Sequence, residues 1–262
     1  MMSVAGKIDV SQVSLQASIR LRAIAATMVT ATACHAPSPP PKLIVWAWER
    51  PEDLRFLPAD TEIAALTGSV ELSVDRVIAH GRRFPLLIGR APVTTAVVHI
   101  EIDGRPLHWT PALADAAVAA VLAYGLRPGI AQLQVDFEVP ASQRRVVLDV
   151  LHIVRSRLPR SMRLSMTAIA SWCDGERWLA AAPVDEVVPM LFRMGAGGPA
   201  LLTRLGGRTA FANPRCRDAL GIASDTPIAD APRVERVYLF SPRSWTFGRF
   251  AATRREVARW GG

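Results

Sequence analysis

The sequence lacks the signatures of several common classes of protein. It contains no run of about 18 uncharged apolar residues, so it predicts no transmembrane helix. No Cys-x-x-Cys or His-Glu-x-x-His motif is present, and we expect no metal ion. No Gly-x-Gly-x-x-Gly follows the first predicted strand, which argues against a dinucleotide-binding fold, and we expect no organic cofactor. No internal repeat is visible, and 262 residues suffice for one large domain or two small ones.

Lysine is almost absent from a chain that is nevertheless basic. The net charge is +8, and 29 of the 31 basic residues are arginine. A basic chain is one indication of nucleic-acid binding. The arginines are scattered, however, and no helix-turn-helix, zinc-finger or RNA-recognition signature accompanies them. We attribute the charge to an arginine-rich coding bias and expect no nucleic-acid partner.

A stretch near the amino terminus resembles a signal peptide. Arg20 and Arg22 precede the uncharged segment 23–33, whose length suits the apolar region of such a peptide. The segment ends in Ala-Thr-Ala before Cys34, which resembles a lipoprotein lipobox, where the cysteine becomes the lipidated first residue after cleavage. These features predict an exported protein, either periplasmic or held at a membrane through a lipid on Cys34. The alternative is a disordered leader or a short surface helix.

The residues after this leader (1–34) divide into a spacer and one domain. Residues 35–41 are rich in proline and predict an extended polyproline linker. Residues 42–262 then form a single domain. Cys173 and Cys216 remain as an even pair in an oxidising compartment, so a disulfide and two partly buried thiols are both open alternatives.

From residue 42 onward, strand-like apolar runs alternate with helix-like segments. The predicted strands are 43–48, 63–72 (interrupted by Gly68), 94–103, 130–139, 164–172, 187–194, 220–224 and 234–241. The predicted helices are 111–124, 142–158, 200–205 and 247–260. About eight strands alternating with helices predict an α/β fold, a single (β/α)8 TIM-like barrel with short loops. An open doubly wound sheet is the alternative.

The fourth predicted strand alternates apolar and polar residues from Ala131 to Val139 without a break. Strand side chains point to opposite faces with period two, so Gln132, Gln134, Asp136 and Glu138 share one face. Helix-like segments flank the strand, which predicts a parallel strand covered on its outer face. Carboxylates inside a fold are costly unless they are paired or used. We therefore expect the polar face to look into the barrel and Asp136 and Glu138 to reach a catalytic mouth.

Other candidate site residues follow from the rule that TIM barrels carry their active sites at the carboxyl ends of the strands. Carboxylates and flat aromatic faces together suit a sugar ligand. The predicted substrate-binding residues are Trp48, Glu49, Glu101, Asp103, Trp172, Arg193 and Trp245.

Each candidate has an alternative structural role. The tryptophans, including Trp46 and Trp178, could be packing residues, and Glu49 could belong to a solvated charge run. Arg193 could be an ion-pair partner of Glu101 or Asp103. His99, inside its strand, is better explained as a core histidine than as a base. A further alternative is a metal-dependent hydrolase that uses His99, Glu101, Asp103 and Asp136 as ligands.

Asp136-Phe137-Glu138 resembles the end of the family 18 glycoside hydrolase (chitinase-like) motif, Asp-x-x-Asp-x-Asp-x-Glu. The resemblance implies that Glu138 is the proton donor and that Asp136 orients the substrate's acetamido group, which acts as the nucleophile. The earlier acids of the motif are replaced by Ala131 and Gln134.

A second resemblance covers most of residues 42–245. The blocks 46–57, 167–173 and 184–195 look like those of an uncharacterised bacterial domain-of-unknown-function family, whose members are often exported and are thought to be chitinase-like barrels. Together the two resemblances imply an exported glycoside hydrolase-like barrel that acts on a polysaccharide. The alternative is a non-catalytic glycan-binding or cell-envelope protein on the same fold.

Overall fold

The computed structural model describes residues 39–260 except 193, 195–196 and 207–209. The described residues belong to one compact unit that begins at Pro39. The predicted leader 1–34 with Cys34, most of the linker 35–41, and Arg193 lie outside them. None of the described helices is long and apolar enough to span a membrane.

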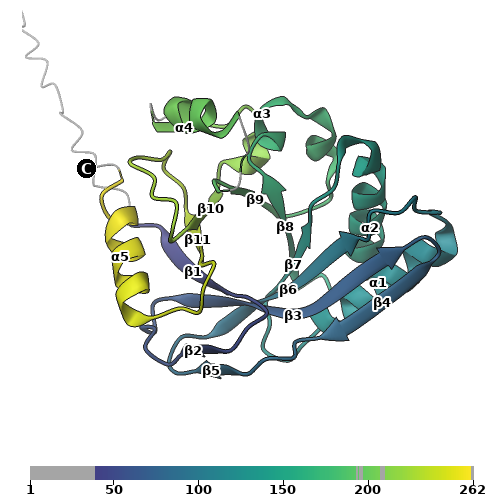
Figure 1. Ribbon diagram of the computed structural model, residues 1–262, viewed down its shortest axis with the longest axis horizontal. Coiled ribbons are helices and arrows are strands. Elements are labelled where there is room, and N and C mark those ends of the chain that lie inside the picture. Colours follow the sequence, from purple (N-terminus) through teal and green to yellow (C-terminus); the bar gives the residue numbers. More distant parts are fainter. Residues whose placement is uncertain (1–38, 193, 195–196, 207–209, 261–262) are drawn as a thin grey trace, which may run out of the picture. The chain divides into compact units, whose positions relative to one another are not determined.

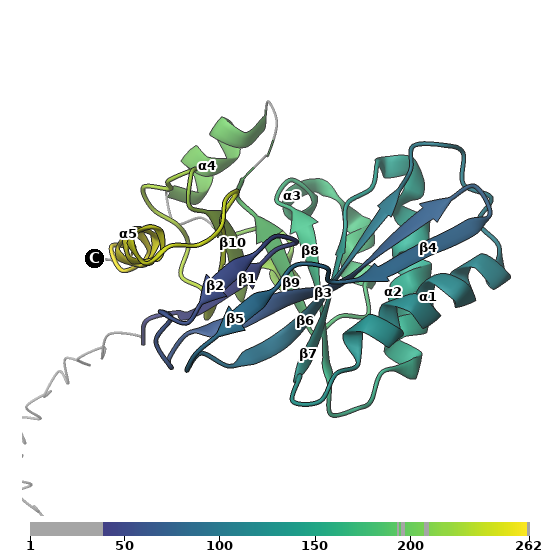
Figure 2. The same cartoon turned by 60° about the horizontal axis from the view of Figure 1, so that its bottom comes forward.

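Eight parallel strands form a closed barrel (Figures 1 and 2). In barrel order they are β1 (Lys42–Ala47), β3 (Glu62–Ser73), β6 (Val93–Ile102), β7 (Gln132–Phe137), β8 (Arg163–Ile169), β9 (Glu186–Met190), β10 (Ala219–Ala223) and β11 (Arg236–Phe240). The ring closes because β1 pairs with β3 on one side and with β11 on the other. This closure decides between the two predicted architectures in favour of the barrel.

Helices follow only some of the strands. The segments α1 (Pro111–Gly125), α2 (Arg144–Arg157, after the 3-10 turn η1, Ala141–Gln143) and α5 (Phe247–Val257) follow β6, β7 and β11. Shorter helices connect β8 to β9 and β9 to β10: α3 (Trp172–Gly175), η2 (Arg177–Ala181), α4 (Gly198–Gly206) and η4 (Pro214–Cys216). The fully described connections after β1, β3 and β10 contain no helix. The (β/α)8 pattern, which has a helix after every strand, is therefore not met in these three units, where the sequence predicted no helix either.

Strand β3 is longer than the other strands of the barrel and forms a hairpin with β4 (Arg76–Gly81). Its predicted interruption at Gly68 was wrong, because the strand continues through a register shift between Leu66 and Gly68. The glycine is required for packing: a Cβ at this position would lie 2.4 Å from Cγ of Tyr124. A small second sheet, of β2 (Glu52–Leu54) and β5 (Leu86–Ile88), has no counterpart among the predicted strands.

The two faces of β7 enter different cores, as predicted. Leu133, Val135 and Phe137 belong to the large apolar cluster between the barrel and its helices, with Val118 of α1 and Val147 of α2. A smaller cluster fills the barrel interior and includes Ile44, Trp46, Val97, Val188 and Tyr238. The polar residues of β7 therefore face this interior, where every polar group needs a partner.

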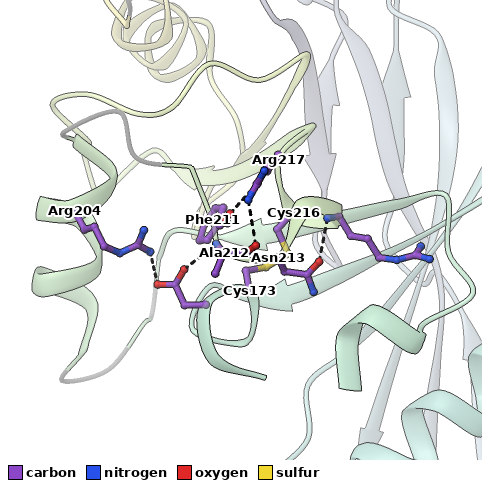
Figure 3. The surroundings of a disulfide bond; sticks show 9 residues. Cys173, Arg204, Phe211, Ala212, Asn213, Cys216 and Arg217 are labelled. Atoms are coloured by element: carbon purple, nitrogen blue, oxygen red, sulfur yellow. Dashed lines mark hydrogen bonds and ion pairs between the residues drawn. A yellow bond between two sulfur atoms is a disulfide. The ribbon is translucent and has the colours of Figure 1, made fainter. Parts of the chain in front are cut away.

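A disulfide joins Cys173 of α3 to Cys216 of η4 (Figure 3). The backbone around it is also hydrogen-bonded, because the amide of Asn213 donates to the carbonyl oxygen of Cys173 at 2.9 Å. Beside it, Arg204 of α4 pairs with Asp174. Of the two alternatives for these cysteines, the structure has the disulfide, which ties the β8–β9 connection to the β9–β10 connection.

Candidate functional site

The carboxyl ends of the barrel strands surround a pocket of about 120 Å³. The described residues that line it come from the ends of β1, β7, β8, β9 and β11: Trp46, Trp48, Asp136, Glu138, Thr167, Ile169, Met190, Phe192 and Phe240. This is the end at which TIM barrels carry their active sites. We call this cavity the mouth pocket.

Asp136 forms part of the pocket floor and is only 6% exposed. Its carboxylate accepts two hydrogen bonds, one from Nδ1 of His99 at 2.8 Å and one from the Thr167 hydroxyl at 2.5 Å. The three residues lie side by side on β6, β7 and β8, because His99 is in register with Asp136 and Val135 is in register with Met166. The cost of burying this carboxylate is thus offset by a donor on each side.

His99 is half-buried beside several acidic groups. Burial lowers its pKa, but the hydrogen bond and charge of Asp136, with further contributions from Glu101 and Glu138, outweigh burial and raise the pKa above 6.5. The imidazole therefore keeps its positive charge to a higher pH than a free histidine would. Its hydrogen-bonded, half-buried position agrees with the predicted core histidine, but its partner is a residue of the pocket.

Glu138 lies one residue beyond the end of β7, is exposed and lines the mouth pocket. The alternation of the strand places it above Asp136 on the same face. The structure thus brings the two predicted catalytic carboxylates to one cavity, one buried in its floor and one open to solvent.

A second polar layer lies deeper in the barrel. Nε1 of Trp46 donates to Oε1 of Gln134 at 2.7 Å, and Nε2 of Gln134 donates to the Ser165 hydroxyl at 2.9 Å. Gln134 has no exposed surface. It occupies the position where the resembled motif has an acid, and its amide fixes the tryptophan ring that forms part of the pocket lining.

A third polar layer closes the amino end of the barrel. Nε2 of Gln132 donates to the Tyr238 hydroxyl at 2.8 Å, and that hydroxyl donates to Oε1 of Glu186 at 2.6 Å. Arg236 pairs with the other oxygen of Glu186 at 3.1 Å. Burial and the nearby Glu186 charge raise the pKa of Tyr238. We call these four residues the base network.

The other predicted carboxylates lie apart from the pocket. Oε1 of Glu49 accepts hydrogen bonds from the backbone amides of Arg83 and Phe84 and so secures a loop. Glu101 is exposed, with Oε2 3.8 Å from Nε2 of His99. Asp103 accepts from Arg105, which lowers the pKa of this carboxyl to about 2. Arg105 is thus the ion-pair partner of Asp103, a role considered for Arg193.

Of the three tryptophans predicted to bind substrate, Trp48 lines the mouth pocket, whereas Trp172 and Trp245 do not. Trp172 is 2% exposed and packs against Trp178 and the Arg144 guanidinium, whose Cζ lies 4.1 Å from its ring centroid. Trp245 is also buried and donates from Nε1 to the carbonyl oxygen of Trp46 at 3.1 Å. These two rings are packing residues, the alternative role given to them above.

Thr167, Phe192 and Phe240 line the pocket, although the sequence did not single them out. The predicted strand 164–172 corresponds to β8 but extended to Trp172, whereas β8 ends at Ile169, so the mouth lies three residues earlier than expected. Had the strand been ended before Ala170, the alternation would have placed Thr167 at the rim.

Within the described residues, no group of three or more histidine, cysteine or acidic side chains is arranged to hold a metal ion. Comparisons of the sequence with protein-family models and with curated proteins, and of the structure with solved structures, find no match. The class of the protein is therefore defined by its fold and site alone: a mixed α/β protein with a closed, all-parallel, eight-stranded barrel and an acidic, aromatic-walled pocket at its mouth.

Proposed function

We propose that this protein is an exported glycoside hydrolase that cleaves a polysaccharide in the mouth pocket. One observation carries the proposal: Asp136 and Glu138 face the same cavity, between aromatic walls, at the catalytic end of a parallel barrel. Glycoside hydrolysis needs an acid that protonates the leaving oxygen and a group that stabilises the positively charged sugar ring.

Glu138 is the general acid of this proposal. It is exposed at the pocket rim, where it can reach a bound glycosidic oxygen and exchange its proton with solvent. In the protonated form it donates to the leaving oxygen as the glycosidic bond breaks, and in the ionised form it then accepts a proton from the attacking water.

Asp136 is suited to orient the substrate rather than to attack it. Both of its oxygens already accept a hydrogen bond, from His99 and Thr167, so its position is fixed at the floor of the pocket. A carboxylate has about four lone-pair sites, so two remain for a donor on the substrate. A substrate acetamido N–H fits this role, and the acetamido oxygen then serves as the nucleophile. The proposed substrates are therefore glycans that contain N-acetylated amino sugars.

The aromatic walls supply the remaining binding surface. Phe192 and Phe240 stack with their ring centroids 5.1 Å apart, and Trp48 packs edge-on against Phe240. Flat rings of this kind bind the apolar faces of sugars while the polar edges hydrogen-bond elsewhere.

The disulfide supports the proposed location outside the cytoplasm. Such bonds persist in oxidising compartments and are rare in reducing ones. The Cys173–Cys216 bond is therefore consistent with export, and a lipid on Cys34 would hold the barrel at a membrane through the proline-rich linker.

The proposal is tested with the variant Glu138→Gln on a panel of peptidoglycan, chitin oligomers and exopolysaccharides. We expect hydrolysis to fall by at least about a thousandfold, because an amide cannot donate the proton, while glycan binding is retained. Glu235→Gln, which removes an exposed carboxylate just before β11 at the amino end, is the matched control and should hydrolyse like the wild type. Full turnover by Glu138→Gln would show that another group is the acid.

Non-catalytic glycan binding is the second candidate. The neutral Gln134, hydrogen-bonded through both its oxygen and its nitrogen, favours it, because the resembled motif has an acid at this position. This alternative predicts that the wild-type protein binds a glycan of the panel and that neither the wild type nor Glu138→Gln hydrolyses it.

A further inference from the structure

We infer that His99 is a positioning residue of the mouth pocket, which holds Asp136 in place through Nδ1 and makes the pocket respond to pH. The inference rests on the proposed function, since it concerns how the same site is organised. His99 is not among the residues that line the pocket, so it acts through those that do.

Asp136 is held between donors on the two neighbouring strands. His99 donates from β6 at 2.8 Å and Thr167 from β8, each to a different carboxylate oxygen. Rotation of this carboxylate, which is only 6% exposed, would break at least one of these bonds. Thr167 is uncharged at every ordinary pH, so His99 is the donor whose charge can change.

His99 also supports a wall of the pocket. Its ring packs edge-on against Trp48, with centroids 5.7 Å apart and planes at 68°. Trp48 in turn makes an edge-on contact with Phe240 at 6.1 Å. The His99 imidazole thus contacts both Asp136 in the floor and Trp48 in the wall of the mouth pocket, without lining the pocket itself.

The charged groups around His99 are predominantly acidic. Asp136 lies on β7 and Glu138 one residue beyond its end. Glu101 lies on β6, with its Oε2 3.8 Å from Nε2 of His99. On the other side of β6, the neighbouring strand β3 places Ser69 in register with His99 and Glu71 in register with Glu101. The next strand, β4, places His80 in register with Ser69. A rise in pH therefore removes the positive charge that the imidazole holds beside these carboxylates. The neutral ring can still keep its proton on Nδ1 and with it the hydrogen bond to Asp136.

Two substitutions of His99 separate the effect of its hydrogen bond to Asp136 from the effect of its positive charge. The amide nitrogen of His99→Asn can take the place of Nδ1, whereas that of His99→Gln takes the place of Nε2. We expect His99→Asn to keep kcat within about threefold of the wild type and His99→Gln to lose about tenfold or more, the range for a charge-assisted hydrogen bond. Both variants lack the cation, so Glu138 holds its proton more tightly and the alkaline limb of the pH profile moves to higher pH in both.

His152→Asn, at an exposed position of α2, is the control and should change neither kcat nor the pH profile. Thermal unfolding of each variant shows whether it is folded. Equal losses in His99→Asn and His99→Gln, with no movement of the alkaline limb, would overturn the inference.

A second measurement needs no substrate. Nitrogen-15 NMR of the imidazoles in the full-length chain, with His99 assigned from the spectrum of His99→Asn, should show Nδ1 protonated throughout the titration. Asp136→Asn should lower the pKa of His99, because the largest interaction that raises it is lost. An unchanged pKa of His99 in Asp136→Asn would refute the inference. Absence of hydrolysis by the wild type would count against the proposed function alone and leave this result standing.

Discussion

Each end of the barrel interior holds a buried, hydrogen-bonded carboxylate, but only the one at the mouth faces an open cavity. At the amino end Glu186 is 4% exposed, and the base network pairs its oxygens with Tyr238 and Arg236. At the mouth Asp136 is also buried and paired, but the cavity above it is open and the exposed Glu138 stands at its rim. The same strand, β7, contributes Gln132 to one end and Asp136 to the other.

The difference shows that polar residues inside this barrel are not functional merely because they are polar. At the amino end Arg236 neutralises the charge of Glu186, and the side chains of Gln132, Tyr238 and Glu186 hydrogen-bond one another. Those at the mouth leave lone pairs and an exposed carboxyl for a ligand. We therefore expect changes at the amino end to affect stability and changes at the mouth to affect function.

The largest expected effect on stability is at the amino end. Glu186→Gln removes the nearer carboxylate of the Arg236 guanidinium, at 3.1 Å, and leaves it only Glu62 at 4.0 Å. Breaking a buried pair in this way costs about 3 to 5 kcal/mol of unfolding free energy. Urea denaturation of this variant beside Glu138→Gln makes the comparison directly. The exposed Glu138→Gln should change stability by no more than about 0.5 kcal/mol. Similar values for the two variants would remove the distinction between the ends.

The disulfide has the next largest effect and lies outside the barrel. Its two cysteines are separated by 43 residues, and a crosslink over such a loop contributes about 2 to 4 kcal/mol by restricting the unfolded chain. The double variant Cys173→Ser, Cys216→Ser should lose this amount in urea denaturation, and the wild type in reductant should match it. Glycan binding at the mouth should be retained, because neither cysteine lines the pocket. Loss of binding at full folding would mean that the crosslink also shapes the mouth.

The sequence predicts the barrel and the mouth because both depend on local patterns. The period-two alternation from Ala131 to Val139 places Gln132, Gln134 and Asp136 inside, as the structure has them, since each residue of a strand reverses the face. The disulfide could not be predicted, because cysteine spacing does not determine Cα separation. The predicted roles of Trp172 and Trp245 failed for a related reason: a tryptophan after a strand can turn outward and pack under a helix, and only long-range contacts decide this.

The missed features also depend on distant residues. Gly68 reads as a strand breaker, but β3 continues through it. The glycine instead serves packing, because the ring of Tyr124, 56 positions later in the sequence, occupies the space that a side chain would fill. The partnership of His99 with Asp136 arises from the register of β6 on β7, which no local pattern specifies. Sequence periodicity thus assigns residues to faces, whereas the register decides which of them meet.

The smallest expected effect on stability concerns a carboxylate that lies near the mouth and is nevertheless buried. Glu52 follows β1 near the mouth, yet it is 3% exposed and structural: Oε2 accepts from the backbone amide of Trp245 at 2.8 Å. Burial raises the pKa of this carboxyl above 4.5, against the opposing effects of that hydrogen bond and of Arg50, Arg82 and Arg249. The folded state therefore holds the proton more tightly than the unfolded state does. The resulting stability is present below about pH 4.5 and is lost as the pH rises through the folded-state pKa.

Glu52→Gln keeps an oxygen for the Trp245 amide and cannot ionise, so it does not lose this contribution. The unfolding free energy of the variant relative to the wild type should consequently rise between pH 4 and pH 7, measured by urea denaturation at both values. Glu235→Gln, which changes an exposed carboxyl near the base network, should show no such trend. A relative stability of Glu52→Gln that falls with pH would mean that the ion pair with Arg50, at 3.1 Å, outweighs burial. Glu52 would then behave like Glu186, and pairing rather than exposure would be the property that distinguishes structural from functional carboxylates in this barrel.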